Sequence, residues 1–396
     1  MNTIINGSTI GKAVRAVKSV AGSGTHYPVL DMMRIRTTQH GLEIVGTNLE
    51  TWINYTIETD VEPGAQVWID KNRLAGAVKG RKGSQNIGIN GGQFQLGSLL
   101  IEDSPEISID YPVEPAVSDA ILVASFVGAE FRAMIKRHKA TSKRLGDTTR
   151  INLCGVNVEY DPKLRGSTWT TTDGYSLTCE EYDGRPAGDN IKRALIPMEY
   201  LIKAAAAAGP KDTVNVEILK SDNGEVCRVS IYSSAGIVEY LIHTTADEFP
   251  DFRRVIPAGN SSLVSFDCNP SELARIVSEA KQTAPEDSGA ITIEVQPAGS
   301  GYQPRAWSSA SVVDRLQVSS SSPAGSYSDS IEIMLHGYAD PKAEPVSFNA
   351  AYLQAVAGFT DNEFIRVSLS SKLQAARFDY DRTQVAVLMP VNMDRS

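Results

Sequence analysis

Residues 67–74 read VWIDKNRL, a short apolar strand that passes directly into the first turn of a helix. The same kind of junction returns at residues 194–201, which read ALIPMEYL, and at residues 346–353, which read VSFNAAYL. The final leucines, at positions 74, 201 and 353, are 127 and then 152 residues apart. We interpret the recurrence as an internal repeat of three units. Chance similarity among strand-to-helix junctions is the alternative that periodicity alone leaves open.

The regions around these junctions have the pattern of a mainly β chain. Short apolar runs, many of them alternating as at 42–45 and 214–218, are separated by turn residues. Helical periodicity is restricted to six segments, which fall into three pairs: 8–21, 70–80, 127–144, 197–208, 270–283 and 349–358. We therefore predict an α+β protein of three repeated domains, each with two helices packed on β-sheets.

Domain boundaries are predicted in the linkers at 112–119 and 257–260. They divide the chain into domains 1–120, 121–257 and 258–396. The larger second offset comes from an insertion rich in Gly, Ser and Pro at 297–328. We expect this insertion to form a long hairpin loop or a mobile excursion.

The composition of the chain excludes several classes of protein. Its 396 residues are 42% hydrophobic, which suits two to four folded domains and argues against disorder. No apolar run is long enough to span a membrane, and the first residues show no apolar signal segment. The four cysteines are scattered, which is typical of buried thiols in a reducing compartment, so we expect a cytoplasmic protein.

Cations gather on the predicted helices although the chain has a formal net charge of −9. In the 127–144 segment they recur at i, i+4, i+7 and i+11, on one helix face opposite an apolar stripe. The candidate cations are Lys12, Arg15, Lys71, Arg73, Arg132, Lys136, Lys139, Lys143 and Arg275. A solvated charged face explains the pattern on any single helix. Its recurrence favours a basic surface that contacts phosphates without reading bases.

Motifs for catalysis and metal binding are not supported. Residues 7–13 (GSTIGKA) are similar to a P-loop motif. However, the spacing between the glycines is one residue short, and Ala13 stands where a P-loop has the Ser or Thr that binds magnesium. The five histidines show no metal-binding spacing, and Asp173-Gly174 is typical of a tight turn. We expect no enzyme, no metal and no cofactor, although a site assembled from distant residues would leave no such motif.

Further motifs are spaced along nearly the whole chain. They are PVL at 28–30 with GTNLE at 46–50, RINLCGV at 150–156 with TDGYSL at 172–177, FPDFRRVIP at 249–257, FNAAYL at 348–353 and VLMPV at 387–391. In this order and spacing they resemble the bacterial sliding-clamp family, the beta subunit of DNA polymerase III, with this chain as a divergent member.

The resemblance implies a processivity factor of DNA replication rather than an enzyme. Two chains would pair head to tail into a homodimeric ring that encloses duplex DNA, with helices inside and sheets outside. It also implies a peptide-binding cleft between the second and third domains, where DNA polymerase, the clamp loader and repair proteins dock through short linear motifs. By position that cleft would use Leu153, Thr172, Gly174, Leu177, Pro250, Arg254, Val255, Asn349, Tyr352, Val387, Met389, Pro390 and Val391.

Two further sets of residues follow from the resemblance. His26 is a candidate for DNA contact, because it lies where the family has a DNA-touching loop. The subunit contact would join a strand to a third-domain helix through Phe94, Leu96, Leu273, Ile276 and Val277, although ordinary domain core explains these residues equally well.

The chain departs from the family at Ser176 and Asn392, where members often have basic residues. These departures put partner affinity in doubt more than the fold. One alternative is a clamp-fold interaction protein that binds clamp partners but does not load on DNA. A second is a hydrolase whose site is assembled from distant residues and is sensitive to Asp173→Asn.

Overall fold

A computed structural model describes residues 2–22, 27–161, 166–183, 192–258, 262–298, 313–337, 344–360 and 362–392. The chain forms two compact units. The first unit comprises 1–136, 155–167 and 182–248, and the second comprises 137–154, 168–181 and 249–396. Within the described ranges, no helix is both long and apolar enough to cross a membrane.

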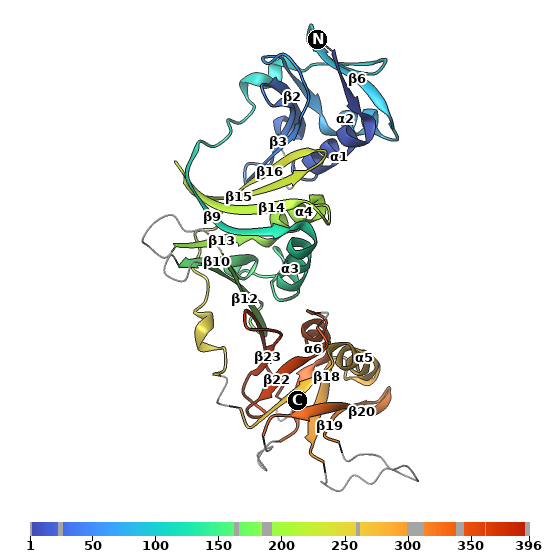
Figure 1. Cartoon of the computed structure of the whole chain (residues 1–396), viewed down its shortest axis with the longest axis vertical. Helices are drawn as coiled ribbons and strands as arrows, with labels where there is room; N and C mark the ends of the chain where they lie inside the picture. Colours follow the sequence, from blue (N-terminus) through green and yellow to red (C-terminus); the bar gives the residue numbers. More distant parts are fainter. Residues whose placement is uncertain are drawn as a thin grey trace. The chain divides into compact units, whose positions relative to one another are not determined.

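The first unit is built on an eight-stranded antiparallel sheet (Figure 1). In spatial order its strands are β5 (Gln66–Asp70), β2 (Met32–Thr38), β3 (Gly41–Thr47), β4 (Thr51–Ile57), β16 (Gly236–His243), β15 (Gly224–Ser233), β14 (Thr213–Ser221) and β9 (Val117–Val127). The two halves of this sheet meet where β4 pairs with β16, from Thr56 opposite Ile237 to Thr51 opposite Ile242. Strands from both predicted repeats one and two therefore share one sheet.

Smaller elements complete the first unit. A four-stranded sheet contains β1 (Asn2–Asn6), β6 (Ser84–Asn90), β7 (Gln93–Leu96) and β8 (Leu99–Glu102), and β10 (Gly155–Asp161) pairs with β13 (Lys192–Pro197). The helices are α1 (Gly7–Lys18), α2 (Lys71–Val78) and α4 (Met198–Ala207), with 3₁₀ turns η1 (Pro28–Asp31) and η2 (Pro105–Ile109). Helices α1 and α2 pack together, and α1 also covers β3 and β4.

The second unit also has a continuous antiparallel sheet. In spatial order its strands are β11 (Gly166–Thr172), β12 (Ser176–Asp183), β24 (Gln384–Leu388), β23 (Ala376–Asp379), β22 (Ile365–Leu369), β17 (Val264–Cys268), β20 (Gly325–Leu335), β19 (Arg315–Ser322), β18 (Ala290–Gln296) and β21 (Val346–Asn349). Helices α5 (Pro270–Ala280) and α6 (Ala350–Ala357) lie side by side on this sheet (Figure 1). The turns η3 (Ile151–Leu153), η4 (Phe252–Arg254) and η5 (Lys281–Thr283) also belong here. Helix α3 (Gly128–Ala140) and strands β11 (Gly166–Thr172) and β12 contribute residues to both units.

The strand-to-helix junctions owe their form to the residue at the end of each strand. Asp70 caps α2 by accepting hydrogen bonds from the backbone N–H groups of Asn72 and Arg73. Asn349 caps α6 in the same way. In the middle junction Pro197 takes this position and supplies no side-chain cap, so only two of the three copies share the cap.

All six predicted helices are present, and the predicted α+β class is confirmed. Helix α3 ends at Ala140, four residues before the predicted end, so Lys143 lies beyond the helix. Within the 297–328 insertion, residues 315–322 are strand β19, which pairs with β20, and residues 299–312 lie outside the described residues. The division into three domains stays a prediction, since the units run across its boundaries.

Candidate partner-binding patch and basic helix faces

The pairing of β12 with β24 brings together two of the sequence motifs. Leu177 lies opposite Val387 in this ladder, and both side chains are buried. The backbone N–H of Met389 donates to the carbonyl of Tyr175 at 2.8 Å, which continues the pairing beyond β24. The TDGYSL and VLMPV segments, 210 positions apart between Leu177 and Val387, therefore form one surface.

An apolar cluster supports this surface. Leu177, Cys179, Phe252, Ala375 and Val387 pack together and are buried. Phe249, Ile256 and Val385 pack against them, with Phe249 edge-on to Phe252. The FPDFRRVIP segment is thus anchored to the β12–β24 ladder through its aromatic residues.

Large apolar side chains lie exposed beside the cluster. The rings of Tyr175 and Tyr352 stack with centroids 6.1 Å apart, and the Lys143 ammonium lies 5.5 Å from the Tyr175 ring centre. Tyr175 is 58% exposed and Met389 is 40% exposed. We call Tyr175, Leu177, Phe252, Tyr352, Val387 and Met389 the junction patch. A flexible methionine beside aromatic rings suits a surface that accepts apolar anchors from several partners.

The turn from Thr172 to Ser176 is held by its own side chains. One Asp173 carboxylate oxygen accepts hydrogen bonds from the backbone N–H groups of Tyr175 and Ser176 at 2.8 and 2.7 Å, and from the Ser176 hydroxyl at 3.0 Å. The Thr172 hydroxyl donates to the Ser176 carbonyl at 2.7 Å, and Gly174 adopts a φ of 93°. Asp173 is therefore a turn residue, which argues against the hydrolase alternative.

The same carboxylate affects Tyr352. Burial first, and then the negative charge and hydrogen bond of Asp173, raise the pKa of Tyr352 to about 12. Asn349 caps the N-terminus of α6 and thereby fixes the position of Tyr352 in its first turn. The Asn349 side chain accepts from the N–H of Ala351 and donates to the Ser288 carbonyl at 2.8 Å.

The remaining predicted cleft residues lie in the same unit but differ in exposure. Leu153 is buried, and its carbonyl accepts a hydrogen bond from the N–H of Lys143. Pro250 and Arg254 are exposed, and Arg254 forms an ion pair with Asp251 at 2.8 Å. Val255, 49% exposed, follows them.

After Met389 the chain runs beside strand β21. The N–H of Val391 donates to the Ser347 carbonyl at 2.7 Å, with Pro390 half-buried before it. Ser176 is buried and points its hydroxyl at Asp173, so no cation stands at that position, while Lys143 on the Tyr175 ring supplies one nearby. Sequence reasoning missed Tyr175, Phe252 and Cys179 as members of this patch. A tyrosine directly after the Asp173-Gly174 turn was the available signal.

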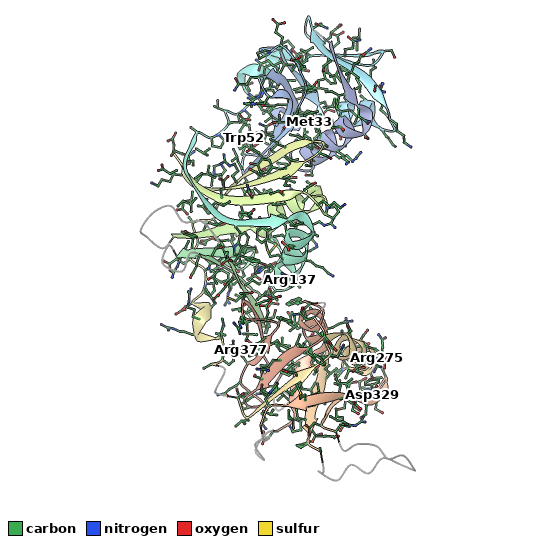
Figure 2. The ribbon with its side chains drawn as sticks, viewed as in Figure 1. Met33, Trp52, Arg137, Arg275, Asp329 and Arg377 are labelled. Carbon is green, nitrogen blue, oxygen red and sulfur yellow. The ribbon has the colours of Figure 1, made fainter. Side chains whose placement is uncertain are left out.

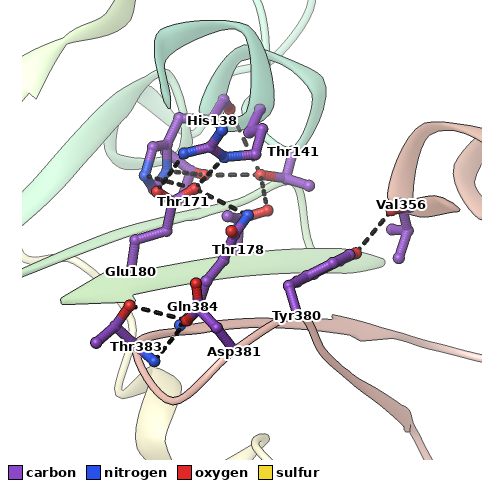
Figure 3. A network of polar contacts seen from close by, with 11 residues as sticks. His138, Thr141, Thr171, Thr178, Glu180, Val356, Tyr380, Asp381, Thr383 and Gln384 are labelled. Carbon is purple, nitrogen blue, oxygen red and sulfur yellow. Dashed lines mark hydrogen bonds and ion pairs between the residues drawn. The ribbon is translucent and has the colours of Figure 1, made fainter. Parts of the chain in front are cut away.

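A buried polar network lies behind β12 (Figure 3). Arg137 at the end of α3 donates two hydrogen bonds, at 2.6 and 2.8 Å, to the two carboxylate oxygens of Glu180. His138 bonds through Nδ1 to the Thr171 hydroxyl at 2.9 Å, and Thr141 links Thr171 to Thr178. Burial, outweighing the attraction of Glu180, lowers the pKa of His138 to about 4, so the imidazole is neutral near pH 7.

The predicted DNA-contacting cations divide into exposed and paired groups. The exposed group is Lys12, Arg15, Arg73, Arg132, Lys136 and Lys139. Lys143 is half-buried beside the Tyr175 ring and belongs to neither group. Lys71 instead pairs with Asp31 at 2.6 Å and donates to the Ala21 carbonyl. Arg275 pairs with Glu279 at 3.0 Å and with Asp329 on β20 at 3.5 Å (Figure 2). His26 lies outside the described residues.

The residues predicted for the subunit contact are buried in the chain itself. Phe94 and Leu96 on β7 lie in the first unit, and Leu273, Ile276 and Val277 on α5 lie in the core of the second. The apolar side chains that are exposed beside β7 are Leu99 and Leu100, on the edge strand β8. A subunit contact in this region stays a prediction.

Comparison of the fold with solved structures gives matches along the whole chain. A DNA polymerase sliding clamp from Bacillus subtilis matches with a TM-score of 0.78 and 19% identity, covering 99% of each chain. The DNA polymerase III beta subunit from Pseudomonas aeruginosa gives 0.77 and 18%, covering 99% of this chain and 100% of that one. The beta subunit from Thermotoga maritima gives 0.75 and 16%, covering 99% of each chain. No family model and no curated protein matches the sequence. The chain therefore has the sliding-clamp fold at low sequence identity.

Proposed function

We propose that this protein is a DNA sliding clamp, a processivity factor that encircles duplex DNA and tethers replication and repair proteins to it. The observation that carries the proposal is the agreement in fold, over 99% of the chain, with the DNA polymerase sliding clamp of Bacillus subtilis and the DNA polymerase III beta subunit of Pseudomonas aeruginosa. The predicted division into three domains, 1–120, 121–257 and 258–396, is part of the proposal. The protein itself performs no catalysis.

Two chains would pair head to tail as a homodimer to close the ring. Among the described strands, β8, with Leu99 and Leu100, pairs on one side only, and such a sheet edge is of the kind that another chain covers. Strand pairing across the subunits would hide it. Phe94, Leu96, Leu273, Ile276 and Val277 would then support the contact from within rather than form its surface.

Duplex DNA would be held without sequence preference. The exposed cations on α1, α2 and α3 can neutralise phosphates through water-filled contacts, because none of the six forms an ion pair within the described part of the chain. Loose contacts of this kind permit sliding. Processivity would come from the closed ring, with the cations keeping DNA centred.

Partners would dock on the junction patch through short linear motifs. Apolar anchors of the motif would lie against Met389 and the Tyr175 and Tyr352 rings, which are supported from beneath by the buried Leu177, Val387 and Phe252. Lys143 beside Tyr175 would attract an acidic residue of the motif. It would take the role of the basic residue that family members often have at the position of Ser176. DNA polymerase and the clamp loader would compete for this surface.

A direct test titrates a fluorescent peptide carrying the clamp-binding motif into the protein and into a chain truncated before Met389. We expect saturable binding that the truncation abolishes. A second measurement follows the protein on nicked circular DNA, where we expect retention that is lost when the DNA is linearised. No peptide binding and no dependence on DNA topology would together contradict the proposal.

A clamp-fold interaction protein that does not load on DNA is the second candidate. The neutralisation of Arg275 by Glu279 and Asp329, and of Lys71 by Asp31, favours it, because fewer cations remain for DNA. It predicts peptide binding as above with no topological retention. Charge reversal of Lys136 and Lys139 would then change nothing in a replication assay.

A further inference from the structure

The first unit contains a hollow of about 700 Å³ on its helix side. The C-terminal halves of α1 and α4 form two walls, and β15 and β16 form the base. The turn 209–212, which follows α4, forms a third wall. Its volume lies within the range of about 300–1,000 Å³ typical of small-molecule sites.

Positive charge dominates the lining. Lys12 and Arg15 come from α1, Lys203 from α4, and Lys211 from the turn, against a single acid among the lining residues, Asp212. That carboxylate is engaged by the backbone, since it accepts a hydrogen bond from the N–H of Gly209 at 2.6 Å. Within the described residues Lys12, Arg15 and Lys211 form no ion pair. The hollow therefore has unneutralised cations at its rim.

The base of the hollow is apolar. Ile202 and Ala206 on α4 face it from one side, and Val238, Tyr55 and Tyr240 lie beneath, where the last three are buried. Lys203 is partly withdrawn from water over the Tyr200 ring, with its ammonium 4.8 Å from the ring centre. A ligand for this site combines a flat apolar body with a negative group that reaches the rim.

We propose that the hollow binds a nucleoside phosphate, with the base on Ile202, Ala206 and Val238 and the phosphate between Arg15, Lys12 and Lys211. The Arg15 guanidinium offers a planar fork of donors that matches phosphate oxygens, and the two ammonium groups add charge. The ligand is either a free nucleotide or an unpaired nucleotide of a DNA strand. The site belongs to one unit of a single chain, so it does not depend on ring closure.

A ligand that is only charged or only apolar fits the hollow less well. An inorganic anion would use the rim and leave the apolar base in water, whereas an uncharged apolar molecule would leave the cations unpaired. An acidic peptide would need one side chain for the cationic rim and another for the apolar base. It therefore fills the hollow less compactly than a single molecule that carries both groups. Charge and shape together thus favour a nucleotide.

The test measures binding of deoxyadenosine 5′-monophosphate to the full chain by isothermal titration calorimetry. We expect saturable binding that Arg15→Glu combined with Lys211→Glu weakens at least about tenfold. Ala206→Phe fills the exposed side of the hollow without changing charge, and should weaken the nucleotide about tenfold while leaving inorganic phosphate unaffected. Lys79→Glu combined with Lys82→Glu makes the same charge change in the first unit outside the hollow, and should leave binding within about twofold of wild type.

Competition then separates the two sources of the ligand. Because Lys12 and Arg15 are also proposed to meet duplex phosphates, displacement of the nucleotide by single-stranded oligo-dT at a clearly lower concentration than by duplex of equal length would support an unpaired DNA strand. Displacement by neither would support a free nucleotide. The proposal fails if the folded chain shows no saturable binding, if Ala206→Phe binds the nucleotide like wild type, or if an acidic peptide binds as tightly. Peptide binding at the junction patch is measured separately, so failure here is distinct from failure of the clamp proposal.

Discussion

The two strand junctions, β4 with β16 and β12 with β24, are made by the same antiparallel pairing but carry opposite surfaces. Beside the first lies a hollow rimmed by cations, with its apolar residues buried beneath. Beside the second, Tyr175 and Met389 lie exposed, and the charge is buried as the Arg137–Glu180 pair. Repetition of a fold therefore conserves strand pairing while the residues around each pairing set what the surface can bind.

The polar contacts behind the two junctions differ in the charge that they bury. At the first, the buried Tyr200 hydroxyl accepts from the Asn48 amide at 2.8 Å and donates at 2.5 Å to the carboxylate of Glu50, which is exposed. At the second, Glu180 is buried, with its side chain 3% exposed, and faces the Arg137 guanidinium. A buried pair of full charges is more costly to disrupt than the two hydrogen bonds of one hydroxyl.

The largest effect is expected from Glu180→Ala. It leaves the Arg137 guanidinium in a buried site without its carboxylate, and should lower the free energy of unfolding by about 3–5 kcal/mol. Tyr200→Phe removes one hydroxyl at the other junction and takes an acceptor from the buried Asn48 amide, so it should cost about 1–3 kcal/mol. Urea denaturation measures both.

Arg254→Ala serves as the control, because it breaks an exposed ion pair with Asp251 and should cost less than about 1 kcal/mol. Equal destabilisation by Glu180→Ala and Tyr200→Phe would contradict the contrast between the junctions.

The next effect is a pH dependence that arises at the second junction from His138. Its pKa is lowered to about 4 in the fold from an ordinary value of 6.5. Between these values the unfolded chain binds more protons, so stability falls as pH drops from about 6.5 to 4, by a few kcal/mol in all. The Thr171 hydroxyl, Glu180 and Arg137 face this ring. Unfolding free energies across this range should show a smaller slope in His138→Gln, and an unchanged slope would refute the assignment.

Periodicity predicted the helices because each depends on its own local spacing of apolar residues. Helix α5, for example, buries Leu273, Ile276 and Val277 as a helical stripe predicts. The junction patch was predicted only in part, since Leu177 and Val387 were placed by family resemblance. Their pairing joins strands far apart in the sequence, and no local pattern encodes it.

Charge pairing was the least predictable feature. Arg275 has the same local pattern as Lys139, an exposed cation on a helix face. Its neutralisation by Asp329 depends on where strand β20 passes, 54 positions further along the chain. The sequence therefore predicts where cations are, but not which of them are free to meet a ligand.

At the junction patch, Met389→Ala should weaken binding of the motif peptide about tenfold, which corresponds to about 1.4 kcal/mol. The side chain is 40% exposed, so its truncation should leave the stability of the fold almost unchanged. Met334→Ala is the matched control, because Met334 on β20 is exposed and lies outside the patch. Fluorescence anisotropy with the labelled peptide makes the comparison. If Met389→Ala and Met334→Ala bound the peptide with equal affinity, the peptide would bind outside the junction patch.

The smallest effect separates free from paired cations. Lys139→Gln removes an exposed charge, so it should lower duplex affinity a few-fold at low salt and reduce the slope of log affinity against log salt by about 0.9. Arg275→Gln removes a charge that Glu279 and Asp329 already neutralise, so affinity and slope should stay near wild type. Binding titrations over a series of salt concentrations measure both quantities. If Arg275→Gln matched Lys139→Gln, the ion pairs on α5 would open when DNA binds, and net charge rather than pairing would govern the contact. If neither variant changed the slope, α3 would not face DNA, and the clamp-fold interaction protein would become the better explanation.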